Sequence, residues 1–143
     1  MHHAAIMKKS WGLLPKILTK EKTIESRWLK NKSKPWGGVS SGDKVYFKNS
    51  GESITVTATV SKVLEIDNLT PNRVKQILYK YGKQDGIDKR NIGKYYRLFK
   101  DKKYCILVFL RNVKAVKPFH INKKGFGAMS AWLTVDNINR IKI

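Results

Sequence analysis

Alternation between apolar and polar residues is clearest from Ser53 to Val60. Every second residue of this stretch is isoleucine, valine or alanine, and threonine or serine lies between them. Because successive side chains of a strand point to opposite faces, this pattern predicts a strand with one buried and one solvated face. The apolar character continues to Ile66, and we expect the strand to continue with it.

Weaker patterns predict five further strands. Thr23–Trp28 alternates, and Val45–Lys48 leads into Asn49-Ser50-Gly51, a turn signal that closes a hairpin onto the next strand. Tyr104–Val116 begins with apolar residues on both faces, as a central strand does, and we expect Pro118 to end it. The remaining two are short and lie towards the C-terminus, at Ala131–Val135 and Ile138–Ile143.

Three segments have helical spacing instead. Ser10 can cap a helix that runs to Thr19, and Thr70 can cap one that begins at Pro71 and ends at Gly82. The third candidate is Asp88–Phe99. About six strands with two or three helices in 143 residues predict a single domain over residues 1–143. We expect the β-rich α+β class, in the form of a partly closed β-barrel that carries the helices.

The charge of the chain indicates the kind of partner that it binds. The chain has 30 Lys and Arg against 10 Asp and Glu, a net charge of +20. An excess of this size favours a polyanionic partner, nucleic acid before an anionic membrane surface. The lysines are spread between apolar segments rather than gathered in a tail, so we expect folding to assemble a basic face. The alternative is a lysine-rich surface of the kind found in proteins from hot environments, but that adaptation usually adds glutamate as well.

Composition excludes several classes of protein. The longest apolar run, Ile106–Leu110, is far shorter than the roughly 20 residues of a membrane span. The apolar stretch after Lys8 and Lys9 is too short for a secretory signal, so we expect a cytoplasmic protein. Cys105 is the single cysteine, which leaves no disulfide framework and no zinc finger. We expect no metal or other cofactor, and a monomer.

Nucleophilic and metal chemistry find little support in the sequence. Cys105 lies in an apolar run, where cysteine behaves as a small buried hydrophobe with a raised pKa. His2 and His3 are either native or a remnant of a tag, and no His or Cys spacing matches a metal site. Gly125-Phe126-Gly127 resembles half of a phosphate-binding loop, but no Gly-Lys-Ser/Thr follows it.

The segment from Lys22 to Trp28 is more informative. A regular strand places Lys22, Ser26 and Trp28 on one side. Glu25 and Arg27 then share the other side, two residues apart. Such a pair can hold the guanidinium fork towards a phosphate or a base edge.

Two other segments combine basic, aromatic and polar groups, Tyr46–Ser50 and Asn122–Trp132. Recognition of single-stranded nucleic acid needs basic side chains for the backbone, aromatic faces for stacking, and amides or hydroxyls for base edges. Alternatively, the aromatic residues Phe47, Phe126 and Trp132 belong to the barrel core. The candidate nucleic-acid-binding residues are Lys22, Glu25, Arg27, Trp28, Lys48, Asn49, Ser50, Lys123, Lys124, Phe126 and Ser130.

Lys20–Arg27 resembles the Gly-x-Lys-x-x-Glu-x-Arg signature of the ASCH (activating signal cointegrator homology) family, with Glu21 set where the glycine is usual. Because glycine permits backbone angles that other residues adopt with strain, we expect a strained turn at Glu21. The resemblance covers nearly the whole chain and is to small stand-alone archaeal members of the family. Its later segments are Gly42–Phe47, Thr55–Val63 and Ala131–Leu133, in the order usual for the family.

This resemblance implies a PUA-like β-barrel with a cleft beside the signature, expected to bind RNA. Lys22, Glu25 and Arg27 would line that cleft, and Lys48–Ser50 would lie near it. Some bacterial members of the family are amidohydrolases that remove the acetyl group of N4-acetylcytidine with a lysine, a threonine and a glutamate. Other members have been proposed to cleave RNA.

The catalytic residues carry over to this chain only in part. Lys22 matches the lysine, but the threonine falls on Glu25, and Glu65 is assigned to the glutamate by position alone. A lysine that activates a hydroxyl must be partly neutral. For cleavage of RNA, Lys22 with Glu25 is the only obvious acid–base pair.

Three hypotheses stand on the sequence. An RNA-binding module is favoured; an enzyme acting on N4-acetylcytidine or RNA is second; a barrel with no nucleic-acid role is third. The partner is single-stranded or structured RNA, DNA, or a modified nucleoside. Whether the protein is an enzyme stays open.

Overall fold

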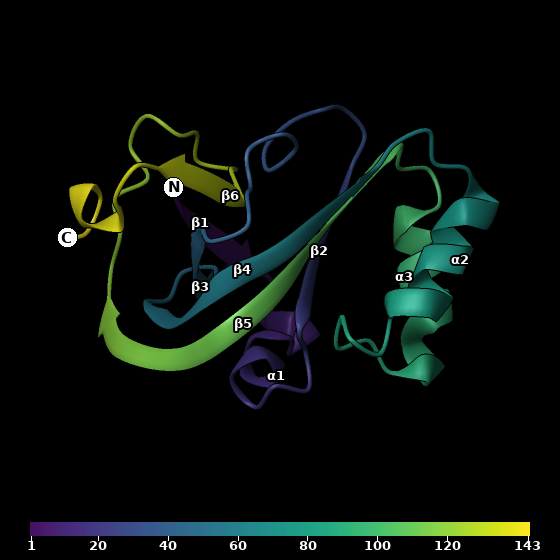
Figure 1. The fold of residues 1–143 in the computed structure, drawn as a ribbon, viewed down its shortest axis with the longest axis horizontal. Coiled ribbons are helices and arrows are strands. Elements are labelled where there is room, and N and C mark those ends of the chain that lie inside the picture. The colour runs from purple at the N-terminus through teal and green to yellow at the C-terminus, as the bar shows by residue number, and fades with distance from the viewer.

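A curled sheet forms the centre of the molecule, which is described over residues 1–143 by a computed structural model. Its six strands have the order β2-β5-β4-β3-β1-β6 and form half a barrel (Figure 1). Only β1 and β3 run parallel. The prediction of a β-rich α+β fold with about six strands is confirmed. The strands are β1 (His2–Met7), β2 (Ile24–Leu29), β3 (Lys44–Asn49), β4 (Ile54–Ile66), β5 (Tyr104–Phe119) and β6 (Trp132–Val135).

The long antiparallel pair β4 and β5 crosses the whole molecule (Figure 1). Its register shifts at three places along β4, and such bulges bend and twist a strand pair, which lets the sheet curl. The expected end of β5 at Pro118 is wrong, because the strand continues to Phe119. Pro118 lies at the very end of the ladder, next to the pair Ile54–Phe119, where a missing N–H costs little.

The strand β1 was not predicted from the sequence. It lies between β3 and β6, and Ala4 and Ala5 at its middle are fully buried. A strand covered on both faces shows no alternation, and two alanines carry too little apolar surface to signal a strand. His3 is fully buried in the same strand. His2 Nδ1 accepts a hydrogen bond from the Ile138 amide.

The C-terminal segment also differs from the expectation of a last strand over Ile138–Ile143. Ile138–Arg140 forms a 3-10 turn, capped by the Asn137 side chain, which accepts a hydrogen bond from the amide of Asn139. Its only β-type pairing is an isolated bridge between Ile121 and Lys142, and the Ile138 amide donates a hydrogen bond to His2 Nδ1 of β1. Asn137 favours this local turn over a ladder.

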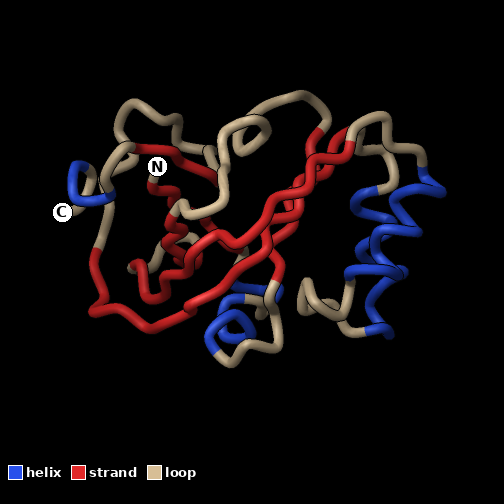
Figure 2. The backbone as a smooth tube through the Cα atoms, in the orientation of Figure 1, coloured by secondary structure: helices blue, strands red, loops and turns tan.

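The predicted helices are present, and two of them begin with a separate 3-10 turn. The segment expected as a helix over Asp88–Phe99 forms a 3-10 turn (Lys89–Asn91) followed by α3 (Ile92–Phe99). The helix expected over Ser10–Thr19 is broken at Gly12, which has a φ of 66°, into a 3-10 turn (Lys9–Trp11) and α1 (Leu14–Leu18). The helix α2 (Pro71–Tyr81) begins where Thr70 accepts a hydrogen bond from the amide of Arg73. It packs against α3 (Ile92–Phe99) to form a helical hairpin at one end of the sheet (Figures 1 and 2).

The apolar side chains form two main clusters. The first fills the curl of the sheet and includes Ile17, Phe47 and Val60. The second lies between the β2–β5 end of the sheet and the helical hairpin. Trp11 packs against both clusters. None of the helices is long and apolar enough to cross a membrane.

Candidate functional site

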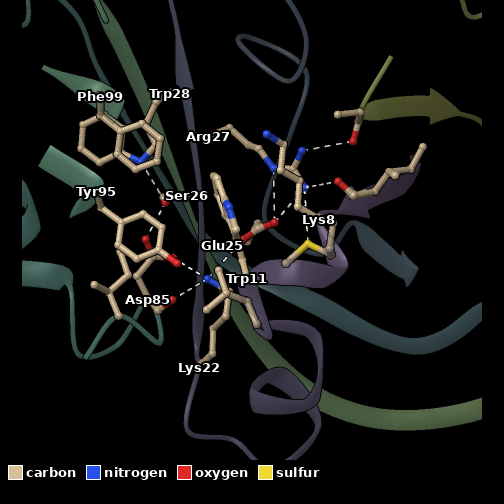
Figure 3. A pocket seen from close by; sticks show the side chains of 15 residues that line it. Lys8, Trp11, Lys22, Glu25, Ser26, Arg27, Trp28, Asp85, Tyr95 and Phe99 are labelled. Atoms are coloured by element: carbon tan, nitrogen blue, oxygen red, sulfur yellow. Dashed lines mark hydrogen bonds and ion pairs between the residues drawn. The ribbon is translucent and has the colours of Figure 1, made fainter. Parts of the chain in front are cut away.

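A cavity of about 200 Å³ lies along the outer edge of β2. The segment Ile6–Leu13 borders it on one side, and α3 with the Asp85–Ile87 turn borders it on the other (Figure 3). Both hydrophobic clusters contribute to its wall, so the cavity lies at the seam between them. Its lining includes Lys8, Trp11, Lys22, Glu25, Ser26, Arg27, Trp28, Asp85, Tyr95 and Phe99.

The sequence placed Lys22, Ser26 and Trp28 on the side of the strand opposite Glu25 and Arg27. All five side chains nevertheless border the cavity. The reason is that β2 is the last strand of the sheet, and the cavity lies against its unpaired edge rather than against one face. Side chains of both faces reach a space at an edge.

Lys22 forms the floor of the cavity, and its side chain is only 1% exposed. Its Nζ lies 2.5 Å from Asp85 Oδ1, 3.2 Å from Glu25 Oε1 and 2.7 Å from the carbonyl oxygen of Asp85. Burial alone lowers the pKa of a lysine, but the carboxylates of Asp85 and Glu25 outweigh it and raise the pKa of Lys22. The ammonium group therefore stays charged.

The two carboxylates around Lys22 have pKa values shifted in opposite directions. Burial, aided by the charge of Glu25, raises the pKa of Asp85 despite the nearby Lys22. Burial also acts to raise the pKa of Glu25, but Lys22 and Arg27 outweigh it and lower that pKa. Of the two acids, Asp85 is thus the one that takes up a proton more readily.

A chain of hydrogen bonds continues from Asp85 to the aromatic wall. The Ser26 hydroxyl donates to Asp85 Oδ2 at 2.5 Å, and Trp28 Nε1 donates to Ser26 Oγ at 3.0 Å. Trp28 in turn stacks on Phe99, with ring centroids 4.8 Å apart and planes 6° apart (Figure 3). The polar floor and the apolar wall are therefore positioned by one another.

Arg27 pairs with Glu25, as the spacing predicted, through Nη2 at 2.8 Å and Nε at 3.2 Å from Oε2. The fork, which borders the cavity, also binds the backbone of two other segments. Its Nη1 donates to the carbonyl of Ala131 at 3.1 Å, and Nη2 also donates to that of Ile6 at 3.3 Å. The guanidinium is thus used to join β2 to the other end of the curled sheet.

Aromatic rings form the walls around this floor. Trp11 makes edge contacts with Tyr95 and Phe99, at centroid distances of 5.3 and 6.4 Å. The Lys8 ammonium lies 5.3 Å from the centre of the Trp11 ring. These contacts reach from the 3-10 turn before α1 across to α3.

The remaining predicted binding residues lie outside the cavity. Asn49 is paired with Met7, a cavity residue, and the Ser50 amide donates to the Met7 carbonyl, so Lys48–Ser50 is one strand away. Ser130 precedes the cavity residue Ala131. Lys123 bonds the carbonyl of Ala128, and Lys124 is exposed.

The aromatic residues outside the cavity are mainly core residues, the alternative weighed from the sequence. Phe47 is fully buried, and Trp132 is 3% exposed. Phe126 packs on a third apolar cluster that contains Ile54 and Leu133.

Sequence reasoning missed Asp85, Trp11, Tyr95 and Phe99. Asp85 follows α2 in a short turn and is separated from Lys22 by 63 positions, so no local pattern reveals their contact. Glu65, the position assigned to a catalytic glutamate, does not line the cavity and instead accepts a hydrogen bond from the amide of Gly37.

The strained turn expected at Glu21 lies one residue earlier. Lys20 has a φ of 68°, in the left-handed region that favours glycine, and Glu21 does not. Counted back from Lys22, Lys20 is also the position that the Gly-x-Lys signature gives to glycine.

The thiol of Cys105 is fully buried, and burial raises its pKa. No three His, Cys, Asp or Glu side chains lie close enough together to hold a metal ion.

Solved structures that share this architecture identify the fold. The crystal structure of an ASCH protein from Zymomonas mobilis matches 94% of this chain and 87% of its own, with a TM-score of 0.66 and 13% identity. The structure of a variant of that protein matches 97% of this chain and 91% of its own, with a TM-score of 0.70 and 13% identity. This chain has the fold of an ASCH domain.

A further solved structure with a similar architecture is the N-terminal domain of McrB from Staphylothermus marinus. It matches 82% of this chain and 75% of its own, with a TM-score of 0.51 and 14% identity. No family model and no curated protein matches the sequence. Identities this low establish the ASCH fold alone.

Proposed function

We propose that this ASCH-fold chain binds nucleic acid, RNA in the first place, by taking one unpaired base into the cavity along β2. The observation that carries the proposal is the cavity itself, with aromatic walls from Trp11, Tyr95 and Phe99 over a polar floor. Stacking faces beside a few hydrogen-bonding groups are what proteins use to hold a base that has left its strand. The net charge of +20 supplies the attraction to the phosphate backbone.

The size of the cavity sets the size of the ligand. Its volume of about 200 Å³ is below the roughly 300–1,000 Å³ of pockets for drug-sized molecules. A single planar group fits this space better than a run of nucleotides. The carboxylate oxygens of Glu25 and Asp85 on the floor are acceptors, which favours a base with an exocyclic amino group.

Hydrolysis of N4-acetylcytidine, or cleavage of RNA, remains the second candidate. It is favoured by the opposite pKa shifts of Glu25 and Asp85, a pattern that acid–base catalysis uses. It is disfavoured by Lys22, whose raised pKa keeps the ammonium charged, whereas a lysine that activates a hydroxyl must lose its proton.

The test is a titration with the four nucleosides and with short single-stranded RNA and DNA, at low and high salt. We compare wild type with Trp11→Leu, and use Tyr79→Leu on the exposed face of α2, where Tyr79 is 59% exposed, as the control. Loss of a stacking ring costs about 1–3 kcal/mol, so affinity should fall at least about fivefold in Trp11→Leu alone. Cytidine and adenosine should bind more tightly than uridine.

Two results would contradict base binding in the cavity. One is nucleic-acid affinity that is equal in the folded Trp11→Leu and Tyr79→Leu variants. The other is no measurable binding of any nucleoside. Acetylcytidine turnover or RNA cleavage in the same samples, lost in Asp85→Asn, would replace the binding proposal with the second candidate.

A further inference from the structure

A second concentration of basic and aromatic residues lies at the end of the sheet beyond Trp28. It surrounds the half-buried rings of Trp36 and Tyr104. We call it the lysine tip, and its cations are Lys30, Lys32, Lys34, Lys100, Lys102 and Lys103.

Strand pairing assembles the lysine tip from two distant segments. Leu29 of β2 is paired with Tyr104 of β5, and the Lys103 amide donates to the Leu29 carbonyl at 3.0 Å. This contact places the loop that starts at Lys30 beside the turn that contains Lys100–Lys103. The two segments are about 70 positions apart in the chain, so the sequence does not show that their lysines form one cluster.

The loop of the lysine tip is held in a defined conformation. The Trp36 ring meets that of Tyr104 edge-on at 5.2 Å, and the Lys32 ammonium lies 6.0 and 5.8 Å from the centres of these rings. The Trp36 amide donates to the Ser33 carbonyl, and the Gly37 amide donates to Glu65 of β4. The carboxylate of Glu65 thus anchors the loop to the sheet.

The cations of the lysine tip are available to a partner. None of the six takes part in an ion pair, whereas Lys9 and Lys22 elsewhere in the chain do. Five of them are exposed, and Lys102 is partly buried. Three carboxylates share this end of the molecule, Glu65, Asp67 and Asp101, so the lysines are in twofold excess.

The lysine tip is continuous with the cavity. Trp28 and Phe99, stacked on one another, belong to the cavity wall. Lys30 follows Trp28 by two residues, and Lys100 directly follows Phe99. On both segments the lysine tip therefore begins within two residues of the cavity wall.

We infer that the lysine tip binds the phosphates of the nucleotides that adjoin the base in the cavity, with Trp36 and Tyr104 as a stacking surface for a second base. This inference rests on the proposed function. It assigns single-stranded nucleic acid a footprint of several nucleotides, of which the cavity holds one. Lysines contribute affinity without sequence preference, and the cavity selects the base.

The experiment compares two triple variants that lose the same charge. Lys32→Ala/Lys34→Ala/Lys103→Ala removes half of the lysine tip, and Lys75→Ala/Lys80→Ala/Lys83→Ala removes three exposed lysines from α2 and the turn after it. Each protein is titrated with a nucleoside and with single-stranded RNA of about ten nucleotides, a length within the range of single-strand sites, over a series of salt concentrations.

In the lysine-tip variant, affinity for the RNA should fall at least about tenfold at low salt, and the slope of log K against log salt should decrease by about 2, since each phosphate contact on a single strand contributes about 0.7. Nucleoside affinity should not change. In the α2 variant, the affinity for RNA and the salt slope should both fall clearly less.

Equal losses in the two triple variants, or an unchanged slope in the lysine-tip variant, would overturn the inference. Nucleoside binding that persists in such a case would leave the proposed function standing. If wild type binds neither nucleoside nor RNA, the proposed function itself has failed.

Discussion

At the scale of single residues, the site depends on Lys22 more than on any other side chain. One ammonium group balances two buried carboxylates and a backbone carbonyl. A buried charge that loses its partner costs far more than the pair contributes while it is intact. The role of Lys22 is therefore structural before it is anything else, because it permits two acids to be placed at the floor of an aromatic cavity.

Removal of the charge at Lys22 tests this role. We expect Lys22→Met to lower the free energy of unfolding by about 3–5 kcal/mol, because it leaves the buried Asp85 without a cation and leaves Glu25 with Arg27 alone. Urea unfolding measures the loss, with the exposed Lys75→Met as a control that should stay within about 0.5 kcal/mol of wild type. Adding Asp85→Asn and Glu25→Gln should recover part of the loss. A loss in Lys22→Met no larger than in the control would show that the carboxylates do not depend on it.

The pH dependence of stability separates the two acids. The pKa of Glu25 lies below its ordinary value of 4.5, so its contribution to stability is complete above that pH and is lost as the pH falls through the folded-state value. Glu25→Gln should therefore flatten the decline of the unfolding free energy in acid. The pKa of Asp85 is raised above 3.8, so its protonation favours the folded state, and Asp85→Asn should steepen that decline.

Unfolding curves at a series of pH values measure both slopes, with the exposed Glu21→Gln as the reference. A change of slope in the same direction for Glu25→Gln and Asp85→Asn would contradict the assignment of opposite shifts.

The sequence could reveal those site residues that lie within one strand. Lys22 was assigned to the cleft by the resemblance to the ASCH signature, whereas the pairing of Glu25 with Arg27 follows from their spacing, because neighbours on a strand stay neighbours after folding. Asp85 does not, because its contact with Lys22 spans 63 positions. Only ten acids occur in the chain, and the sequence does not show which of them is buried.

At the scale of elements, periodicity predicts a strand that has one buried and one solvated face, and it misses a strand that is buried on both faces. β4 alternates, and its bounds agree with the prediction, including its continuation to Ile66. β1 is covered on both sides, and its sequence shows no period. Side chains from both faces of β2 border the cavity because β2 has a free edge. The sequence could not predict this, because the order of the strands in the sheet decides which strand lies at the edge.

The turn that delivers Asp85 to the site depends on Gly86. Its φ is 78°, and a Cβ there would lie 3.1–3.3 Å from the Cβ, Cγ and Cδ atoms of Lys22, which is too confined to move away. Gly51 is a matched control, since its φ is 79° and no atom lies within 4 Å of the added Cβ.

Both Gly86→Ala and Gly51→Ala should lose about 1–2 kcal/mol of stability from the left-handed backbone. Only Gly86→Ala should lose more than this and also bind a nucleoside more weakly, because it displaces Lys22. Calorimetric melting and the nucleoside titration measure the two effects. Identical behaviour of the two variants would show that the cavity floor tolerates the shift.

At the scale of the whole molecule, Arg27 joins two ends of the curled sheet. It belongs to β2, the first strand in spatial order, and it bonds carbonyls of β1 and of the segment before β6. The half barrel is thereby closed by a side chain rather than by strand pairing. The sequence shows the number of lysines directly. It could not predict this closure, because the closure joins three segments that are separate in the chain.

Arg27→Lys keeps the charge and removes the planar fork. We expect it to lower the free energy of unfolding by about 1.5–3 kcal/mol, the range for hydrogen bonds to charged groups. Exchange of the Ile6 amide, which shares the Ala131 carbonyl with Arg27, should become faster. The exposed pair Arg90–Asp88 supplies the control, Arg90→Lys. Unchanged exchange at Ile6 would mean that Arg27 does not hold the sheet closed.

The position of the cavity at the seam has a consequence for the helical hairpin. Met7 and Leu13 border the cavity from one hydrophobic cluster, and Ile87 and Tyr95 border it from the other. An occupant that touches both clusters adds a contact between the half barrel and the helical hairpin. The coupling is reciprocal: an occupant that stabilises the packing of the hairpin against the sheet binds more weakly when a substitution loosens that packing. The helical hairpin is thus a reporter of occupancy, although its outer helix does not line the cavity.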